Sequence, residues 1–311
     1  MENKPLPLIK WQLPMKRVLY ALVPAVCASI YFFGWRSLLL LFIVHIAGGL
    51  SEYAFSRYFK SPVSSSVFVT NTLFALALPP SVPLWIAVIG IIFAVVFGKM
   101  AFGGFGRNIF NPALAGRAFI YVSFPAYITA AWVRPLATPI GGLLSFTPDM
   151  LSAATPLVQL TSQINIPLLK LFLGHTSGCL GETSALAILI GGVYLVIKRT
   201  ANYKIILSGA ASFLVFQTLF FLFNIHNAPH PLYAVLSGGF LFGMFFMATD
   251  PVSASQTETG RWIYGAFIGA VTVLIRTFSV WAEGMMFAIL LANIFAPIMD
   301  YGIRSLKGRK T

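Results

Sequence analysis

The sequence predicts an all-α integral membrane protein with about ten transmembrane helices. The chain of 311 residues is 58% hydrophobic and only 9% charged, and its mean hydropathy is +0.84. So few charges cannot cover the surface of a soluble globule. The net charge of +13 raises nucleic-acid binding as an alternative, but the basic residues lie mostly in short segments between apolar runs, which is typical of membrane topology. We therefore expect contact with lipid and none with nucleic acid.

Ten apolar segments are long enough to be counted as spans. An even number of crossings places both chain termini on the same side of the membrane. Of the 21 Lys and Arg residues, sixteen, Lys99 among them, fall in the tails and loops of that side, and three (Arg36, Arg134 and Lys170) fall opposite. This excess predicts cytoplasmic termini. The segments are 18–35, 37–56, 63–79, 83–98, 110–127, 181–197, 205–224, 232–249, 262–281 and 284–303.

The spans divide the chain into two transmembrane halves around a long loop. A cytoplasmic tail (1–17) precedes the first half (18–127), and a basic cytoplasmic tail (304–311) follows the second (181–303). The loop 128–180 then faces outward, away from the cytoplasm.

Two spans carry signs of broken helices. The third contains Thr70, Asn71 and Thr72 and ends at two prolines, which is typical of a re-entrant segment shielded by protein. The eighth ends at Asp250-Pro251. Short sequence similarities link the halves. Thr70-Asn71 matches Thr249-Asp250, and Asn108-Ile109-Phe110-Asn111-Pro112 matches Asn293-Ile294-Phe295-Ala296-Pro297. Five spans per repeat would invert one half relative to the other and place ligand sites near the midplane.

Three carboxylates fall within or at the ends of spans: Glu52, Asp250 and Asp300. An ionised carboxylate there costs several kcal/mol unless it is paired or hydrated, so these residues are candidates for a cation or proton path. The alternative is simple pairing with a base: Arg57 with Glu52, Arg304 with Asp300, and Arg276 or Arg117 with Asp250. The cysteines and histidines are scattered without ligand spacing, and we expect no metal site.

A glycine-rich run, Gly103-Gly104-Phe105-Gly106-Arg107, leads into Asn108 and Asn111. Arg107 is suited to a phosphate, but no strand–turn–helix context supports a dinucleotide fingerprint. Asn108 and Asn111 are three residues apart, on one face if helical, and their amides offer donors and acceptors to a heterocycle. Ordinary asparagine caps at a helix entry are the alternative.

The outward loop contains the polar motif Asp149, Ser152, Ala154 and Thr155, followed by Pro156. A threonine before a proline is a common N-cap and first-turn pair. A helix N-terminus also attracts phosphate, so a cap and a phosphate-bearing group at Thr155 do not exclude each other.

Several segments in order resemble one membrane-subunit family, shared by the D subunit of the Rnf complex and the B subunit of the sodium-pumping NADH:quinone reductase. The matching segments are Gly103–Leu114, Gly181–Ala187, Phe246–Val252 and Glu283–Leu290.

The resemblance implies two flavins. A separate flavin transferase would join FMN through a phosphoester to Thr155, within the Asp149–Ser152–Ala154–Thr155 motif. Riboflavin would bind without a covalent bond beside Asn108 and Asn111, with Arg107 nearby. The resemblance also implies that Glu52, Asp250 and Asp300 handle Na⁺ or H⁺, and that no side chain is itself catalytic.

The Ala-Thr-Pro-Leu sequence at 154–157 and the short N-terminus favour the Rnf complex, with its A, B, C, E and G subunits as partners. Gly116-Arg117-Ala118-Phe119 and the methionine pair after Gly284 favour the quinone reductase, which stays open. A secondary transporter or channel is the alternative of another class, because broken spans and acids near the midplane suit a carrier as well. We expect a multi-pass protein of a bacterial or archaeal cytoplasmic membrane that relays electrons within a translocase.

Overall fold

The computed structural model describes residues 8–129, 131–136, 141–147, 153–279 and 284–308, and its regular structure there is helical apart from one short ladder. In that ladder β1 (Ile9–Lys10) runs parallel to β2 (Val63–Ser64). It ties the segment before the first helix to the segment before the third. The all-α fold class is confirmed.

The first half of the chain folds into helices whose boundaries follow from local chemistry. Gly34, with φ of +80°, separates the first two helices. Asn111 caps the fifth, its side chain accepting a hydrogen bond from the Ala113 amide, and Pro112 occupies the first turn. The elements are α1 (Leu13–Phe33), α2 (Trp35–Tyr58), α3 (Ser66–Leu76), α4 (Leu84–Val96), the 3₁₀ turn η1 (Met100–Phe102), α5 (Pro112–Ser123) and α6 (Pro125–Thr129).

Short elements follow in the loop, and longer helices form the second half. Ser184, Asn202 and Thr257 cap α9, α10 and α13 through their side chains. The elements are η2 (Gly141–Leu144), α7 (Pro156–Thr161), α8 (Leu168–Leu173), α9 (Ala185–Ile197), α10 (Tyr203–Leu222), η3 (Ile225–Asn227), α11 (Pro231–Leu236), α12 (Phe240–Phe242), the π-helical turn η4 (Gly243–Met247), α13 (Glu258–Phe278) and α14 (Met285–Gly308).

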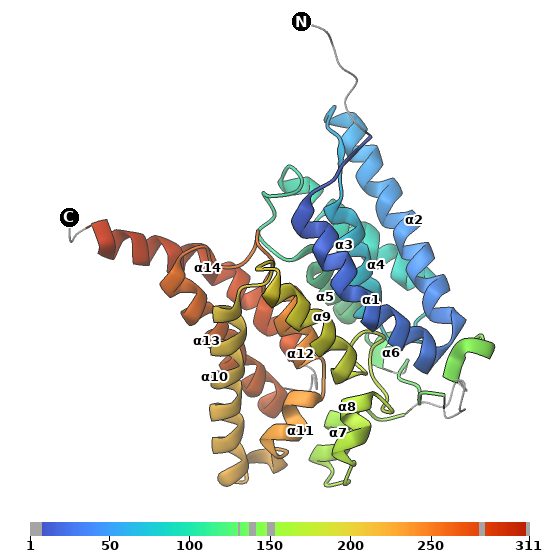
Figure 1. Cartoon of the computed structure of the whole chain (residues 1–311), viewed down its shortest axis with the longest axis vertical. Helices are drawn as coiled ribbons and strands as arrows, with labels where there is room; N and C mark the ends of the chain where they lie inside the picture. Colours follow the sequence, from blue (N-terminus) through green and yellow to red (C-terminus); the bar gives the residue numbers. More distant parts are fainter. Residues whose placement is uncertain (1–7, 130, 137–140, 148–152, 280–283, 309–311) are drawn as a thin grey trace, which may run out of the picture.

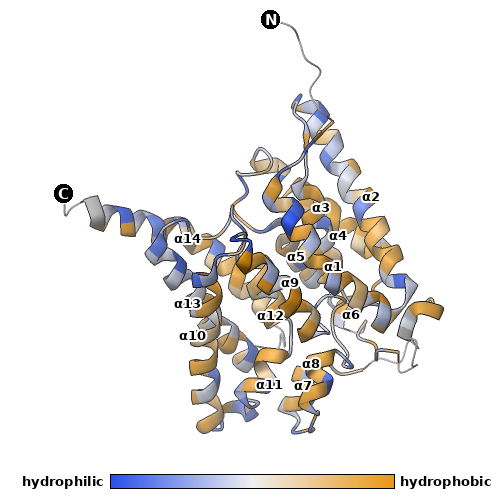
Figure 2. Cartoon of the chain, viewed as in Figure 1, coloured by the Kyte–Doolittle hydropathy of each residue, from blue (hydrophilic) through white to orange (hydrophobic). Residues whose placement is uncertain are grey.

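Five helices are long and apolar enough to cross a membrane, and one bent pair of segments makes a sixth candidate, among the described residues. Figure 2 shows the long apolar stretches of α2 and α10. The other predicted spans also contain helices, but α3 and α9 are short and α13 does not meet the same criteria. The count of ten spans is therefore not confirmed and stays a prediction.

The third segment is shielded by protein, as predicted, and the eighth has a bend inside it that the sequence did not predict. Ten of the eleven residues of α3 are buried, so this helix is shielded by protein. The eighth segment bends by 53° between residues 225–236 and 240–247. Gly238 and Gly239, with φ of +63° and +68°, allow that bend because glycine has no Cβ to clash.

Helices at equivalent positions of the two halves pack on each other. α1 packs on α9, and α5 packs on α14. Within the halves, the contacts of α4 with α2 and α5 recur as contacts of α13 with α10 and α14. In Figure 1, α1 descends from the end that carries the N-terminus, whereas α9 rises toward that end. These pairings agree with an inverted five-plus-five repeat, which stays a prediction.

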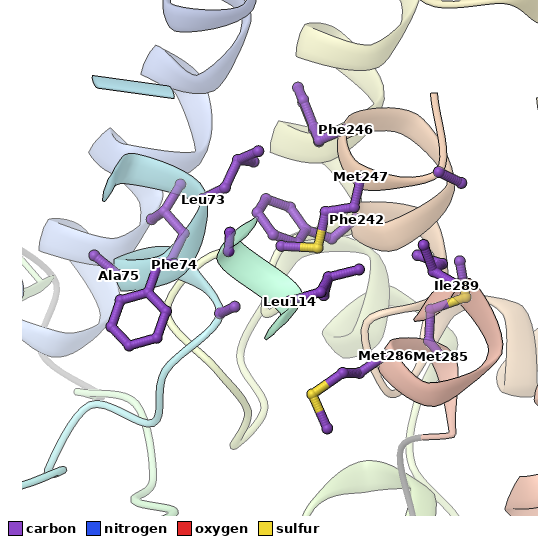
Figure 3. Close-up of a cluster of buried hydrophobic side chains, with 14 of the residues drawn as sticks. Leu73, Phe74, Ala75, Leu114, Phe242, Phe246, Met247, Met285, Met286 and Ile289 are labelled. Carbon is purple, nitrogen blue, oxygen red and sulfur yellow. The ribbon is translucent and has the colours of Figure 1, made fainter. Parts of the chain in front are cut away.

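The apolar core continues across the contact between the halves. Figure 3 shows buried side chains from both halves around this contact. The labelled side chains are Leu73, Phe74 and Ala75 of α3, Leu114 of α5, Phe242, Phe246 and Met247 of the broken segment, and Met285, Met286 and Ile289 of α14.

Candidate flavin and ion sites

Thr155 stands at the start of α7, as the Thr-Pro pair predicts. Its backbone is extended, with φ of −66° and ψ of 156°, and Pro156 fills the first turn. Its side chain, however, makes no capping hydrogen bond. α7 has only six residues, so its dipole is weak. The cap position is therefore present, but the hydroxyl does not act as a cap.

The backbone beside Thr155 is held in place by long-range hydrogen bonds. The Ala154 carbonyl accepts from Gln159 Nε2 at 2.7 Å and from Ser177 Oγ at 2.6 Å. The Ala153 amide donates to the Trp132 carbonyl at 2.9 Å. These bonds fix the direction in which the Thr155 side chain leaves the chain. Asp149 and Ser152 of the same motif lie outside the described residues.

Two hollows adjoin Thr155. The smaller, about 360 Å³, is lined by Thr155 itself together with Ser177 and Glu182. The larger, about 1030 Å³, is lined by Ala153 and Pro156 and by three exposed basic side chains, Arg134, Lys170 and His175. We call it the outer hollow. Within the described ranges, neither Arg134 nor Lys170 pairs with a carboxylate. Sequence reasoning missed this grouping, although it placed Arg134 and Lys170 in the same loop.

A second pocket, about 640 Å³, lies where the two halves meet, and we call it the inner pocket. Most of its lining is apolar, with a small set of polar side chains. It brings together residues that are far apart in the sequence. The polar side chains are Ser66, Thr70, Lys99, Asn108, Asn111, Thr200, Thr249 and Asp250.

Asn108 and Asn111 both line the inner pocket, but they do not share a helical face. Residues 107–111 precede α5, and Asn111 is its cap. The Asn111 side chain also donates to the Met247 carbonyl at 3.3 Å, and its backbone amide donates to Asn293 Oδ1 at 3.1 Å. Asn108 donates to the Phe110 carbonyl at 2.9 Å. Arg107 is exposed and does not line this pocket.

Glu52 is paired, but its partner is Lys99 and not Arg57. Lys99 Nζ lies 2.6 Å from Glu52 Oε2, and the Ser64 amide donates to Oε1 at 3.1 Å. Lys99 lies in the turn after α4, as its placement in a loop predicts, but it is buried, with a relative exposure of 1%. The sequence predicts a partner close to Glu52 in the chain. Because α2 and the end of α4 pack together, the actual partner lies 47 residues away.

Asp250 lines the inner pocket and is held by its own turn. Its carboxylate accepts from the Val252 amide at 3.1 Å and from Ser253 Oγ at 3.0 Å. The two arginines predicted as alternative partners have other contacts: Arg276 donates to the carbonyls of Ala234, Ser237 and Gly238, and Arg117 donates to Cys179 Sγ at 3.1 Å.

Asp300 has a structural role in the turn before α13. Its carboxylate accepts from Ser255 Oγ and Thr257 Oγ1, each at 2.6 Å, and from the Gln256 amide at 2.7 Å. These bonds replace the predicted pair with Arg304. Asp300 lies outside the lining of the inner pocket, so the structure groups Glu52 and Asp250 around Lys99 and leaves Asp300 apart.

Comparison with known proteins agrees with the family resemblance seen in the sequence. Residues 9–307 match the family described as the NQR2, RnfD, RnfE family. The chain is 45% identical over 266 residues to the B subunit of the Na(+)-translocating NADH-quinone reductase of Pseudomonas aeruginosa (strain LESB58), which covers 82% of this chain and 64% of that protein. The B subunit of the same enzyme from Yersinia pestis is 42% identical over 296 residues, covering 89% and 71%. The chain thus spans about two thirds of the length of these relatives.

Proposed function

Because the chain belongs to the NQR2, RnfD, RnfE family, we propose that it is the flavin-carrying membrane subunit of an ion-translocating electron transport complex. FMN is joined through a phosphoester to Thr155, riboflavin binds in the inner pocket, and Na⁺ or H⁺ passes by Glu52 and Asp250. The relatives named above support the quinone-reductase alternative, and the Rnf assignment favoured by the sequence is not confirmed.

The observation that carries the proposal is the hydroxyl of Thr155. It makes no capping bond, it is half-buried at the edge of two hollows, and its backbone is fixed by the bonds to Ala154. A transferase needs a reachable, uncommitted hydroxyl in a fixed position. A purely structural N-cap would use that oxygen to accept a backbone N–H.

The chemistry of the outer hollow fits a phosphoester. A phosphodiester carries a negative charge, and Arg134 and Lys170 supply positive charge in the hollow next to Pro156. Basic residues are scarce on the outward side under the positive-inside rule, so two of them around one hollow need a reason. Neutralising an anionic group beside Thr155 is such a reason.

The inner pocket fits an uncharged heterocycle better than a phosphate. Its lining is largely apolar, with amides and hydroxyls as its main polar groups. Lys99, the one basic side chain among its described lining residues, is already paired with Glu52. Riboflavin, which lacks the phosphate of FMN, matches that donor set. When bound, the two flavins supply the redox chemistry, and the chain supplies their spacing, orientation and electrostatic surroundings.

The charge pattern supports an orientation for the chain in the membrane. Without the buried Lys99, fifteen basic residues still fall on the side of the termini against three opposite. We infer that both termini are cytoplasmic and that Thr155 faces outward. Electrons from the cytoplasm must then cross the membrane through partner subunits before they reach Thr155.

The decisive experiment is in-gel flavin fluorescence after expression with the native flavin transferase. We expect the denatured band of the chain to fluoresce under ultraviolet light and to lose its fluorescence completely in Thr155→Val. Thr161→Val is the matched control, because the Thr161 hydroxyl is already bonded to the Leu157 and Val158 carbonyls of α7. A dark wild-type band would contradict the proposal and favour a secondary transporter, which the broken segment and the paired halves also suit.

A further inference from the structure

Lys99 is the most deeply buried basic residue that the structure describes, with a relative exposure of 1%. Its ammonium donates to Glu52 Oε2 and to Ser66 Oγ, each at 2.6 Å. An ammonium has three protons to donate, and two of them are used in these bonds. A buried lysine is costly unless an opposite charge compensates it, and Glu52 provides that charge.

The charges around the inner pocket do not balance. Lys99 and Asp250 are the two charged side chains among its described lining residues, and their charges interact. With Glu52 behind Lys99, the cluster has two carboxylates and one ammonium. The cluster therefore balances only when Asp250 holds a proton or a further cation lies beside it.

A second hollow adjoins this cluster and shares part of its lining. The inner pocket shares Thr200, Thr249 and Asp250 with a neighbouring hollow of about 1150 Å³ that is also lined by Arg199 and Arg261. The Thr200 hydroxyl is buried and has no hydrogen-bond partner among the described residues. Buried polar atoms are normally satisfied, and hydroxyl and carboxylate oxygens are the ligands that hard cations prefer. Thr200 and Asp250 thus offer oxygen ligands in this shared lining.

We propose that Lys99 is a tethered counter-cation, which occupies the Glu52–Ser66 site at rest and exchanges with a single monovalent cation that enters past Thr200 and Asp250. This inference rests on the ion-translocating function proposed above. The lysine stem is flexible, so its ammonium can turn from Glu52 toward Asp250 within the same pocket. With one cation bound, the cluster of Glu52, Asp250, Lys99 and the cation is neutral, and a second cation is excluded.

The test is equilibrium binding of radioactive Na⁺ at pH 8 to the detergent-solubilised complex, kept oxidised so that no turnover occurs. We expect one Na⁺ per wild-type chain. Lys99→Gln leaves two uncompensated carboxylates, so it should bind two Na⁺, the first about tenfold more tightly because the site is more negative. Lys204→Gln is the control, since Lys204 pairs with Glu258 at the surface, and it should bind as the wild type does.

Glu52→Gln gives the opposite expectation. Lys99 then neutralises Asp250, and Na⁺ binding should fall at least about tenfold. If Lys99→Gln fails to assemble, the double variant Glu52→Gln/Lys99→Met removes both charges of the pair and should bind one Na⁺ more tightly than the wild type. Three results would each overturn the proposal. Lys99→Gln could bind one Na⁺ with the wild-type affinity, the double variant could bind Na⁺ with the wild-type affinity, or the wild type could bind no Na⁺. Fluorescence at Thr155, read on the same samples, reports separately on the proposed function.

Discussion

The outer hollow beside Thr155 and the inner pocket between the halves both gather charged side chains, but they hold them differently. Arg134 and Lys170 are exposed and have no carboxylate partner within the described ranges. Lys99 is buried, and its ammonium donates to Glu52 and Ser66 among the described residues. Water screens the outer charges, so leaving them unpaired costs little in the free energy of folding. In the inner pocket each charge requires a specific partner, so a change there affects folding as well as function.

Lys99→Met should break the inner arrangement with the largest effect. It leaves Glu52 buried without a counter-charge, and we expect the free energy of unfolding to fall by about 3–5 kcal/mol in Na⁺-free buffer. Added Na⁺ should recover part of this loss. Denaturing-detergent titration of the purified protein measures both quantities. Lys204→Met, at the surface, should change stability by less than about 0.5 kcal/mol. An equal loss in both variants would contradict the difference between buried and exposed charges.

Asn111→Ala should have the next largest effect. It removes the cap of α5 and leaves the Met247 carbonyl without the hydrogen bond from Asn111. We therefore expect the free energy of unfolding to fall by about 2 kcal/mol and the non-covalent riboflavin to be lost. The control is Asn202→Ala, which removes a cap from α10 outside the inner pocket. It should cost about 1 kcal/mol and leave riboflavin in place. Acid extraction followed by chromatography of the released flavin measures retention, and equal riboflavin content in both variants would argue against the inner pocket as the site.

Ser177→Ala sharpens the outer side of the comparison. It removes one of the two donors to the Ala154 carbonyl, so the unfolding free energy should fall by only about 1 kcal/mol. The loosened backbone at Thr155 should lower covalent flavin attachment several-fold, as measured by in-gel fluorescence per amount of protein. Full attachment in Ser177→Ala would show that this bond does not position Thr155.

The smallest effects are expected for Arg134→Gln and Lys170→Gln. Stability should change by less than about 0.5 kcal/mol, because both side chains are exposed. Loss of a nearby positive charge disfavours the gain of an electron, so the midpoint potential of the covalent flavin should fall by about 10–40 mV for each change. Redox titration followed by absorbance measures this shift. A potential that does not move in the double variant would place the flavin away from the outer hollow.

Much of the fold was predictable because apolar runs and helix-breaking or helix-capping residues set helix boundaries through local interactions. Pro156 and Asn111 start helices where the sequence places them. Gly34 separates α1 from α2, although the sequence extends the first span to residue 35. The sequence predicts ligand sites near the midplane, and Asn108, Asn111 and Asp250 line one pocket between the halves.

The partners of charged residues were not predictable in the same way. A lysine one residue beyond a predicted span is the expected pattern for a cytoplasmic loop, yet Lys99 turns inward because α2 carries Glu52 at the same level. Sequence spacing predicts that Asp300 pairs along its own helix, but the turn before α13 supplies four hydrogen bonds to its carboxylate. Such contacts depend on tertiary packing, which short-range sequence patterns do not report.

The burial of α3 has a consequence for how the protein is made. α3 is eleven residues long and has Thr70, Asn71 and Thr72 in its middle, so it is a poor substrate for insertion into lipid on its own. Its neighbours α2, α4 and α5 surround it in the finished protein. The later helices must therefore be synthesised before α3 can reach its final position. Until then the translocation machinery must hold or reinsert a segment that the bilayer alone would not retain.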